Sequence, residues 1–244
     1  MSEPLIQVRG LSVGYADQVL LERADFDVER GDVFVILGGS GCGKSTLLRH
    51  LIGLEQPRAG QIEIAGFGAP RLMGAAPEYG VMFQSGALFS SLTVGENVAF
   101  ALSEWTDLPQ PAINAIVRAK LALVGLEGAE DKLPSEISGG MKKRAAIARA
   151  MAFEPSLLFL DEPSAGLDPV SAAELDDLIL VLNRALGLTV VMVTHELASI
   201  FKVGKNCIML DQESRSIIAR GDPRALEQES RDLRVRRFFR REAA

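Results

Sequence analysis

A glycine-rich loop in the first fifth of the chain has the residue types and spacing of a phosphate-binding site. Residues 38–46 read GGSGCGKST, which fits the pattern G-x4-G-K-[ST]. Glycines let successive backbone N–H groups face phosphate oxygens, while Lys44 would supply a cation and the Ser45 hydroxyl a magnesium ligand. Cys42 is expected to be an inert small residue, with a redox switch as the alternative. The predicted nucleotide-binding residues of this loop are Gly38, Gly39, Ser40, Gly41, Cys42, Gly43, Lys44, Ser45 and Thr46.

Acidic residues and a histidine follow two apolar segments further along the chain. Residues 157–163, LLFLDEP, read as a buried strand that ends in two carboxylates, at the sheet edge where open α/β sheets place ligands. Asp161 is predicted to act on the magnesium side through water, and Glu162 to orient and polarise the attacking water. His195 follows the apolar run 189–193, so right-handed crossovers would bring it within reach of a γ-phosphate. The alternative is a pair of solvated acids and a structural histidine.

The elements that must position these residues alternate between strand and helix patterns. Residues 5–37 have a β pattern, and the loop at 38–46 lies between an apolar run and leucines at helical spacing, which add a helix dipole to the phosphate site. Alternating strands and helices predict an α/β fold with a mainly parallel sheet covered on both faces. Only helical patterns appear between residues 83 and 157, which predicts an inserted helical subdomain at about 85–153. The buried strands are expected at 33–37, 80–83, 157–160 and 189–193, and further helices at 110–124, 139–153 and 171–186.

Composition bounds the class of protein. The 244 residues are 48% hydrophobic and 24% charged, which suits one large α/β domain or two small ones. The net charge of −6 argues against nucleic acid as a partner. Two distant cysteines, Cys42 and Cys207, argue against a disulfide framework and fit a reducing compartment. The sequence predicts neither an export signal nor a membrane span, which leaves a peripheral membrane subunit open.

A second candidate anion site lies at residues 137–150, ISGGMKKRAAIARA, where Ser138, Gly139 and Gly140 precede a helix. One triphosphate does not need two such sites in one domain. At this point the sequence resembles the ATP-binding cassette (ABC) ATPase family, whose LSGGQ signature it matches as ISGGM. In that family two subunits enclose two ATP molecules, and the signature of one subunit faces the phosphate loop of the other.

Other short segments match the family pattern in order over nearly the whole chain. Tyr15 stands at the position of the adenine-stacking aromatic, and Gln84 at the Q-loop glutamine, which contacts magnesium and water and relays to the permease. Residues 164–168, SAGLD, resemble the D-loop, with Asp168 crossing the dimer interface, and Thr194 with His195 resembles the switch histidine. Met141 replaces the signature glutamine, so this position is not expected to carry chemistry.

The resemblance implies a complete functional assignment. It implies a single ABC-type P-loop NTPase domain over residues 1–244, with an N-terminal antiparallel β subdomain beside the parallel core. ATP and Mg2+ are the implied cofactors, and the implied reaction is ATP hydrolysis. The implied catalytic residues are Glu162, His195, Gln84 and Lys44, and the implied metal ligands are Ser45, Gln84 and Asp161.

Two features suggest the type of cassette: the chain contains one cassette, and two of its segments resemble one type of transporter. One cassette without a long heptad insertion favours a separate transporter subunit over translation factors or repair machines. Residues 83–109 and 133–158 are similar to ATPases of bacterial MCE lipid transporters of the Mla type. That similarity implies a membrane permease, an MCE-domain lipid-binding protein, a STAS-domain regulator, phospholipid as substrate, no nucleic acid, and the cytoplasmic face of the bacterial inner membrane. An importer of a small polar solute such as an amino acid, and a soluble ABC machine acting on nucleic acid or protein complexes, remain as alternatives.

The C-terminal segment at about 231–241 holds six arginines, and Leu233 or Val235 with Phe238 and Phe239 follows helical spacing. The sequence predicts a short basic amphipathic helix there. Two interpretations stay open: contact with anionic headgroups or a partner, or packing of the aromatic side chains on the domain with the arginines solvated.

Overall fold

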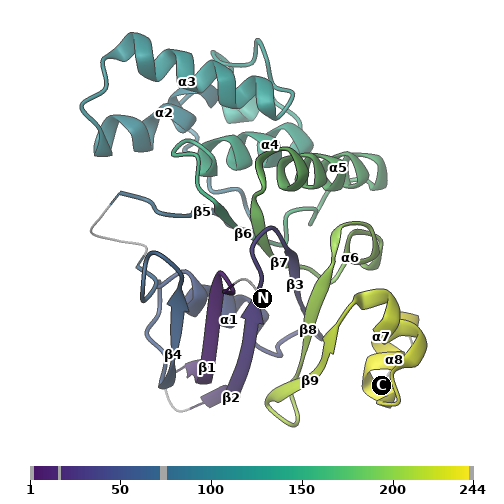
Figure 1. Ribbon diagram of the computed structural model, residues 1–244. Coiled ribbons are helices and arrows are strands. Elements are labelled where there is room, and N and C mark those ends of the chain that lie inside the picture. Colours follow the sequence, from purple (N-terminus) through teal and green to yellow (C-terminus); the bar gives the residue numbers. More distant parts are fainter. Residues whose placement is uncertain (1–2, 16–17, 72–75, 242–244) are drawn as a thin grey trace.

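The computed structural model describes residues 3–15, 18–71 and 76–241 and contains two sheets. Residues 1–2 and 242–244, at the ends of the predicted 1–244 domain, lie outside the described part. The smaller sheet is antiparallel and has the strand order β2-β1-β4, and the larger one has the order β5-β6-β7-β3-β8-β9 (Figure 1). The antiparallel strands are β1 (Ile6–Tyr15), β2 (Gln18–Val28) and β4 (Ala59–Ile64).

The larger sheet is parallel from β5 to β8 and ends in an antiparallel pair, β8 with β9. Its central strands are continuous apolar runs because helices or the second sheet cover both faces. The parallel arrangement places the ends of β3, β6 and β7 at one edge, as predicted. The strands are β3 (Val33–Gly38), β5 (Gly80–Met82), β6 (Leu157–Asp161), β7 (Thr189–Val193), β8 (Asn206–Asp211) and β9 (Ser216–Gly221).

Alternate side chains of β3 enter two separate hydrophobic cores, because successive strand residues point to opposite faces. Phe34 and Ile36 pack with the antiparallel sheet and with helix α1 (Lys44–Leu51). Val35 and Leu37 pack on the opposite face, where α5 (Pro169–Leu186) and α6 (Leu197–Val203) lie. The phosphate loop therefore leaves a strand that is fixed on both sides.

The chain between β5 and β6, residues 83–156, contains helices and, in its described residues, no strand. We call it the helical segment; in Figure 1 its helices α2 and α3 lie at the top of the molecule and the antiparallel sheet at the bottom. The predicted fold class is confirmed by these two sheets and the helices, whereas the subdomain boundaries 85–153 stay a prediction. The helices are α2 (Val94–Trp105), α3 (Gln110–Leu123), a 3-10 turn (Pro134–Glu136) and α4 (Gly139–Ala150).

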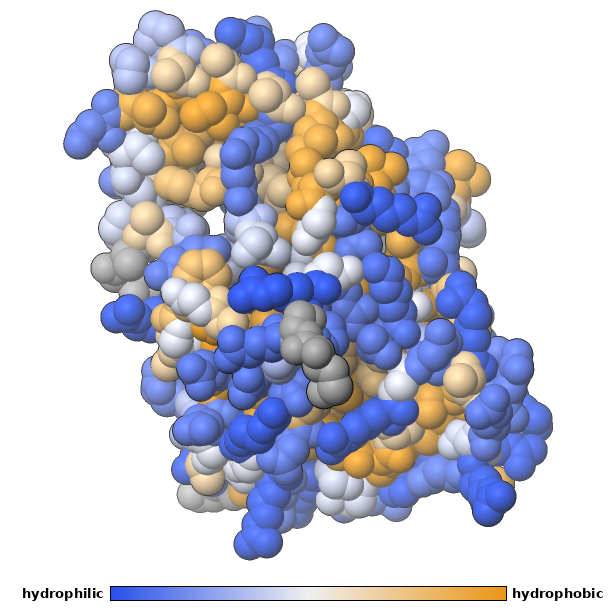
Figure 2. Space-filling model, viewed as in Figure 1, coloured by the Kyte–Doolittle hydropathy of each residue, from blue (hydrophilic) through white to orange (hydrophobic). Residues whose placement is uncertain are grey.

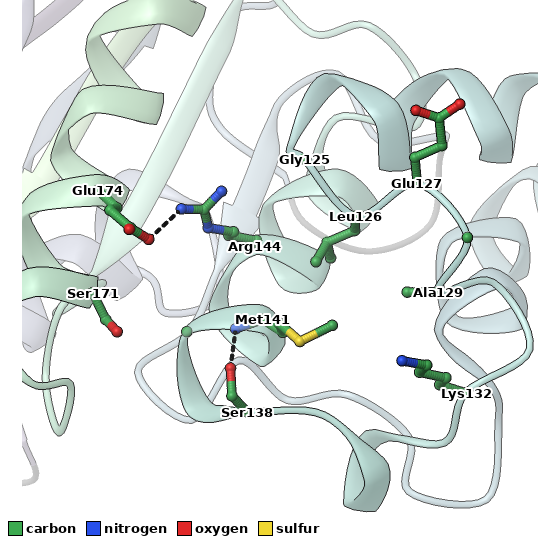
Figure 3. A pocket seen from close by; sticks show the side chains of 12 residues that line it. Gly125, Leu126, Glu127, Ala129, Lys132, Ser138, Met141, Arg144, Ser171 and Glu174 are labelled. Carbon is green, nitrogen blue, oxygen red and sulfur yellow. Dashed lines mark hydrogen bonds and ion pairs between the residues drawn. The ribbon is translucent and has the colours of Figure 1, made fainter.

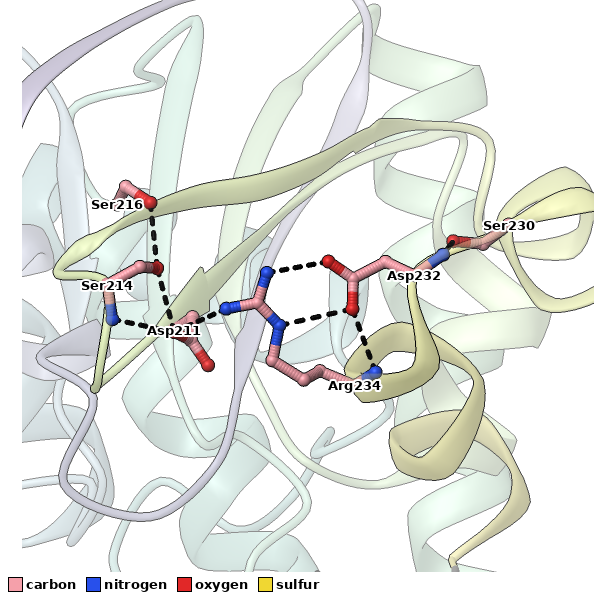
Figure 4. A network of polar contacts seen from close by, with 6 residues as sticks. All are labelled: Asp211, Ser214, Ser216, Ser230, Asp232 and Arg234. Carbon is pink, nitrogen blue, oxygen red and sulfur yellow. Dashed lines mark hydrogen bonds and ion pairs between the residues drawn. The ribbon is translucent and has the colours of Figure 1, made fainter.

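The C-terminal segment forms α7 (Pro223–Glu229) and α8 (Leu233–Arg240). Val235 and Phe239 are buried in the core, and the Phe239 ring centroid lies 5.5 Å from that of Phe201. Figure 4 shows the polar contacts that hold α8: the Arg234 guanidinium binds Asp211 at 2.9 Å and Asp232 at 2.6 Å. The aromatic side of the basic helix thus packs on the domain. No helix in residues 3–15, 18–71 and 76–241 is both long and apolar enough to cross a bilayer.

Candidate active site

The phosphate loop joins the end of β3 to the start of α1 and lines an open cleft of about 640 Å³. Gly43, the residue before α1, has φ 98°, and Gly38 has φ 143°, both in the region that favours glycine. A Cβ on Gly38 would lie 2.6 Å from the Leu210 carbonyl oxygen, so the loop approaches the sheet too closely for a side chain. No side chain caps α1, which leaves its first N–H groups directed at the cleft for an anion.

Lys44 and Cys42 have different environments within this loop. The Lys44 ammonium donates hydrogen bonds to the Gly38 and Gly39 carbonyl oxygens at 2.9 and 2.8 Å, so it lies folded over the loop. Cys42 is buried, and burial raises the pKa of its thiol even though the Lys44 charge opposes this effect. A thiol that stays protonated fits the prediction of an inert small residue rather than a redox switch.

Tyr15 lines the cleft from the end of β1 and is 45% exposed, so its ring is accessible to a base. Its hydroxyl lies 2.5 Å from the Thr46 hydroxyl of the phosphate loop. The predicted adenine-stacking residue is therefore brought to the predicted phosphate site.

The three predicted metal ligands line one neighbouring cleft of about 520 Å³. The Ser45 hydroxyl donates to an Asp161 carboxylate oxygen at 3.2 Å, and Gln84 follows β5 on the same cleft. Burial raises the pKa of Asp161, while the Ser45 hydrogen bond acts in the opposite direction and the Glu162 charge adds to the rise. A divalent cation would favour the ionised carboxylate, and hydroxyl, amide and carboxylate oxygens are the donors that Mg2+ prefers. Residues 3–15, 18–71 and 76–241 contain no cluster of three or more His, Cys, Asp and Glu side chains that could hold a metal ion.

Glu162 and His195 lie in contact on the lining of the phosphate-loop cleft. The His195 Nδ1 lies 2.8 Å from Glu162 Oε1, and the His195 side chain is 58% exposed. Glu162 is only 8% exposed, and its second carboxylate oxygen, Oε2, is buried with no hydrogen-bond partner in the described part of the chain. Because Oε2 is buried beside the phosphate loop without a partner among the described residues, it is available to accept a hydrogen bond from a reactant, as a general base requires.

The backbone holds Glu162 in an uncommon conformation, with φ 46°. Its N–H donates to the Val193 carbonyl at the end of β7, at 2.9 Å. Because β6 and β7 are adjacent and parallel, this bond fixes Glu162 beside the segment that carries His195. Left-handed conformations of residues with side chains concentrate at functional sites, because the surroundings must enforce them.

The signature residues lie at a different pocket from the phosphate loop. Ser138 caps α4, and its hydroxyl accepts the Met141 N–H at 3.2 Å, while Gly139 and Gly140 form the first helical turn. Figure 3 shows the adjoining pocket of about 300 Å³, into which the Met141 thioether extends. None of the residues that line this pocket also lines the phosphate-loop cleft. One copy of the chain therefore presents its two anion sites separately.

Asp168, predicted to cross a dimer interface, caps α5 in this structure. Its carboxylate accepts the Val170 and Ser171 N–H groups, each at 3.0 Å, and the Ser171 hydroxyl at 2.5 Å. The hydrogen bonds from Ser171 hold the pKa of Asp168 below its usual range.

Several residues of the site were not predicted from the sequence. Gln18, Leu20 and Phe238 line the phosphate-loop cleft, and Lys143 reaches the carbonyl oxygens behind it. The sequence signal for Phe238 was its helical spacing with the other apolar residues of the C-terminal segment. That spacing predicted a packed helix but not that the helix lies beside the cleft. Lys143 stands in the basic run after the signature, which carries no sign of burial by itself.

Comparison with protein families and curated proteins agrees with this site. The family model described as ABC transporter matches residues 21–165. The intermembrane phospholipid transport system ATP-binding protein MlaF of Haemophilus influenzae is 40% identical over 249 residues, covering 100% of this chain and 93% of the relative. MlaF of Escherichia coli K12 is 40% identical over 240 residues, covering 96% and 88%. A Mycobacterium leprae protein described as the probable ribonucleotide transport ATP-binding protein mkl is 43% identical, covering 84% of this chain and 60% of the relative.

Solved structures give the same result. The structure of cbiO1 from Clostridium perfringens, part of the ABC transporter complex cbiONQ, has a TM-score of 0.82 and 30% identity, covering 93% of this chain and 92% of that one. A dimeric post-hydrolysis state of an ATP-binding cassette bound to ADP and Pi has a TM-score of 0.78 and 26% identity, covering 89% and 98%. The phosphate loop and Glu162 lie within the region that the family model matches, and His195 follows it in the chain. From these findings the chain belongs to the ABC transporter family, as an ATP-hydrolysing cassette.

Proposed function

We propose that the chain is the ATPase subunit of a transporter that moves phospholipid between the inner and outer membranes of a bacterium. Two MlaF proteins, each described as part of an intermembrane phospholipid transport system, share 40% identity with nearly the whole chain. The observation that carries the ATPase part is the Glu162 and His195 pair, 2.8 Å apart, in the cleft that the phosphate loop lines.

The residues of the cleft divide the reaction among them. The loop N–H groups and the Lys44 ammonium hold the phosphates, and Tyr15 stacks on the adenine. Ser45, Gln84 and Asp161 hold Mg2+, which when bound neutralises charge that develops on the transferred phosphoryl group. Glu162 Oε2 orients and polarises the attacking water, and His195, held by Oε1, reaches the γ-phosphate.

A second copy of the chain completes each site. Ser138, Gly139 and Gly140 line or adjoin a pocket that shares no lining residue with the phosphate-loop cleft, so they serve a nucleotide held by the partner copy. Similar cassettes have been solved as dimers, one with ADP and Pi bound. Closure of two copies around two ATP molecules then drives the permease, and hydrolysis reopens the dimer. To contact the partner copy, the Asp168 carboxylate would have to give up its hydrogen bonds from the Val170 and Ser171 N–H groups.

The proposed membrane partner docks on the helical segment. Figure 2 shows apolar surface gathered over this part of the molecule. Phe89, Phe100, Trp105 and Leu108 are exposed there, and the Phe89 and Phe100 ring centroids lie 5.0 Å apart. Exposed apolar surface of this kind is typical of a protein interface. We assign it to a permease in the inner membrane, which places the chain on the cytoplasmic face, together with an MCE-domain lipid-binding protein and a STAS-domain regulator.

The test uses a Glu162→Gln chain, tagged and isolated from native membranes with ATP. The variant should bind ATP with unchanged affinity but lose turnover by about 100-fold or more, because the amide cannot accept the proton of water. Mass spectrometry of the co-isolated material should then find a polytopic permease, an MCE-domain protein and phospholipid.

Each other result contradicts a defined part of the proposal. Normal turnover by Glu162→Gln would remove the assignment of the base. A permease with a periplasmic solute-binding protein would change the substrate to a small polar molecule, and no membrane protein at all would indicate a soluble ABC machine.

A further inference from the structure

Lys143, in the second turn of α4, carries a buried ammonium group. The residue lies five positions after Ser138 and is 8% exposed. Lysine is almost never buried to this degree unless its charge is paired or hydrogen bonded. The partners of Lys143 therefore indicate why it is buried.

Its partners are the backbone carbonyl groups of two residues to which we assign chemistry. The Lys143 ammonium nitrogen donates to the Gln84 carbonyl oxygen at 2.5 Å and to the Glu162 carbonyl oxygen at 3.4 Å. Gln84 belongs to the helical segment and Glu162 follows a strand of the core sheet. One ammonium group thus bridges the signature helix, the Q-loop and the end of β6.

The shorter bond, to the Gln84 carbonyl oxygen, is one of several contacts between α4 and the Q-loop. Arg149, later on the same helix, donates to the carbonyl oxygens of Gly86 at 2.8 Å and Ala87 at 2.6 Å. The signature helix therefore holds residues 84–87 along its length. A movement of α4 carries the Q-loop with it, whereas the longer bond to Glu162 links this unit to the core.

The same position places a positive charge behind the two acids. Burial lowers the pKa of Lys143, and the charges of Asp161 and Glu162 act against that lowering. The side chain forms no direct ion pair with either carboxylate, so its donors remain on the two carbonyl groups.

The carbonyl bond acts on a residue whose conformation needs support. Glu162 has φ 46°, a left-handed conformation that is strained for a residue with a side chain. Its carbonyl oxygen accepts from the Ala165 N–H at 3.1 Å as well as from Lys143. The direction of the Glu162 side chain toward His195 depends on this backbone geometry.

We propose that Lys143 is a positioning residue for ATP hydrolysis. It sets Gln84 relative to Glu162, and it links the helix whose signature serves the partner copy to the water-activating residue of its own copy. The inference rests on the proposed roles of Gln84 and Glu162.

The test compares substitutions at Lys143 in the transporter isolated with its partner subunits. Lys143→Met removes the donors and the charge at similar length, and Lys143→Arg restores both. The neighbouring Lys142→Met is the matched control, because Lys142 lies on the same helix and is less buried. ATP affinity, KM, kcat and thermal unfolding are measured for each variant, with Glu162→Gln in parallel.

We expect Lys143→Met to lower kcat by about 10-fold or more, with KM and ATP affinity within about twofold of the parent, because only positioning is lost. Lys143→Arg should recover most of the loss, and Lys142→Met should match the parent. Lys143→Gln keeps an amide donor group without the charge, so its kcat should lie between those of the parent and Lys143→Met, and this variant serves if the Met variant does not fold.

Two results would overturn the inference. One is an unchanged kcat in Lys143→Met, or in Lys143→Gln if the Met variant does not fold. The other is a joint fall of ATP affinity and kcat with lower thermal stability and no recovery by Arg, which is the pattern of a purely structural residue. Normal turnover by Glu162→Gln would instead refute the proposed role of Glu162 on which the inference rests, so the two failures are distinguishable.

Discussion

A buried carboxyl group between α5 and α6 allows a quantitative prediction of stability. Asp176 is 2% exposed, and its Oδ1 has no hydrogen-bond partner among the residues that the structure describes. Burial raises its pKa from 3.8 to about 6, while a hydrogen bond with Ser199 and the charge of Lys202 act in the opposite direction. The charges of Asp177, on α5, and of Glu196, directly before α6, add to the rise.

The sign of the effect follows from proton uptake. Between pH 3.8 and about 6 the folded state binds this proton more tightly than the unfolded state, so the free energy of unfolding falls as the pH rises through that window. A pKa shift from 3.8 to about 6 corresponds to about 3 kcal/mol of lost stability at pH 8, and to about half of that at pH 5. At neutral pH the ionised Asp176 carboxylate therefore destabilises the contact between α5 and α6.

Asp176→Asn removes the charge at constant shape. We expect the free energy of unfolding at pH 8 to rise by about 1 to 3 kcal/mol, because the neutral amide does not require the hydration that burial removes. The gain should shrink to about half at pH 5. Urea unfolding followed by circular dichroism at both pH values measures it, and C_m should shift without a change in m.

The neighbouring Asp177→Asn is the control, because its carboxylate is 65% exposed and pairs with Lys202 at 2.7 Å. An exposed pair contributes at most about 1 kcal/mol, so that variant should be neutral or slightly destabilised at both pH values. A destabilised Asp176→Asn variant, or a gain that stays the same from pH 5 to pH 8, would refute the reasoning.

Three further predictions concern the cleft and the two cysteines. Lys44→Ala should weaken ATP binding by about 10-fold or more, since a charge-assisted contact to phosphate is lost, and unchanged affinity in isothermal titration would contradict its role. Phe238→Ala should weaken nucleotide binding several-fold, because the ring lines the cleft, whereas Leu233→Ala, at a side chain 62% exposed on the same helix, should not; equal affinities for both variants would count against a contact. Cys42 and Cys207 should react with iodoacetamide at pH 7.5 only after unfolding, because burial raises both pKa values, that of Cys207 to about 12, and rapid labelling of the native protein would be inconsistent with this.

The chemistry of the site was predictable where a few adjacent residues determine it. The phosphate loop contains its glycines, its lysine and its hydroxyl within residues 38–46, and their positions follow from one strand and one helix. The approach of Glu162 to His195 also followed from the sequence, because neighbouring parallel strands end at one edge of the sheet.

The rest depended on contacts between distant segments. The sequence predicted a basic helix at the C-terminus but not its position, which Arg234 fixes by binding Asp211 in the hairpin of β8 and β9. That hairpin and helix α2 gave no separate prediction, because short segments acquire their structure from tertiary packing. Phe238 reaches the cleft only as a consequence of this docking.

Lys44 and Lys143 differ in how freely they can change hydrogen-bond partners. The Lys44 ammonium donates to the carbonyl oxygens of Gly38 and Gly39, in a cleft that is open to solvent. A phosphate oxygen is a stronger acceptor than a carbonyl oxygen. Nucleotide binding should therefore draw Lys44 away from the loop carbonyls. Lys143 cannot make the same exchange, because it is buried and its carbonyl partners belong to Gln84 and Glu162. We therefore expect Lys44 to change partners when nucleotide binds. Lys143 instead holds Gln84 and Glu162 at fixed positions relative to α4.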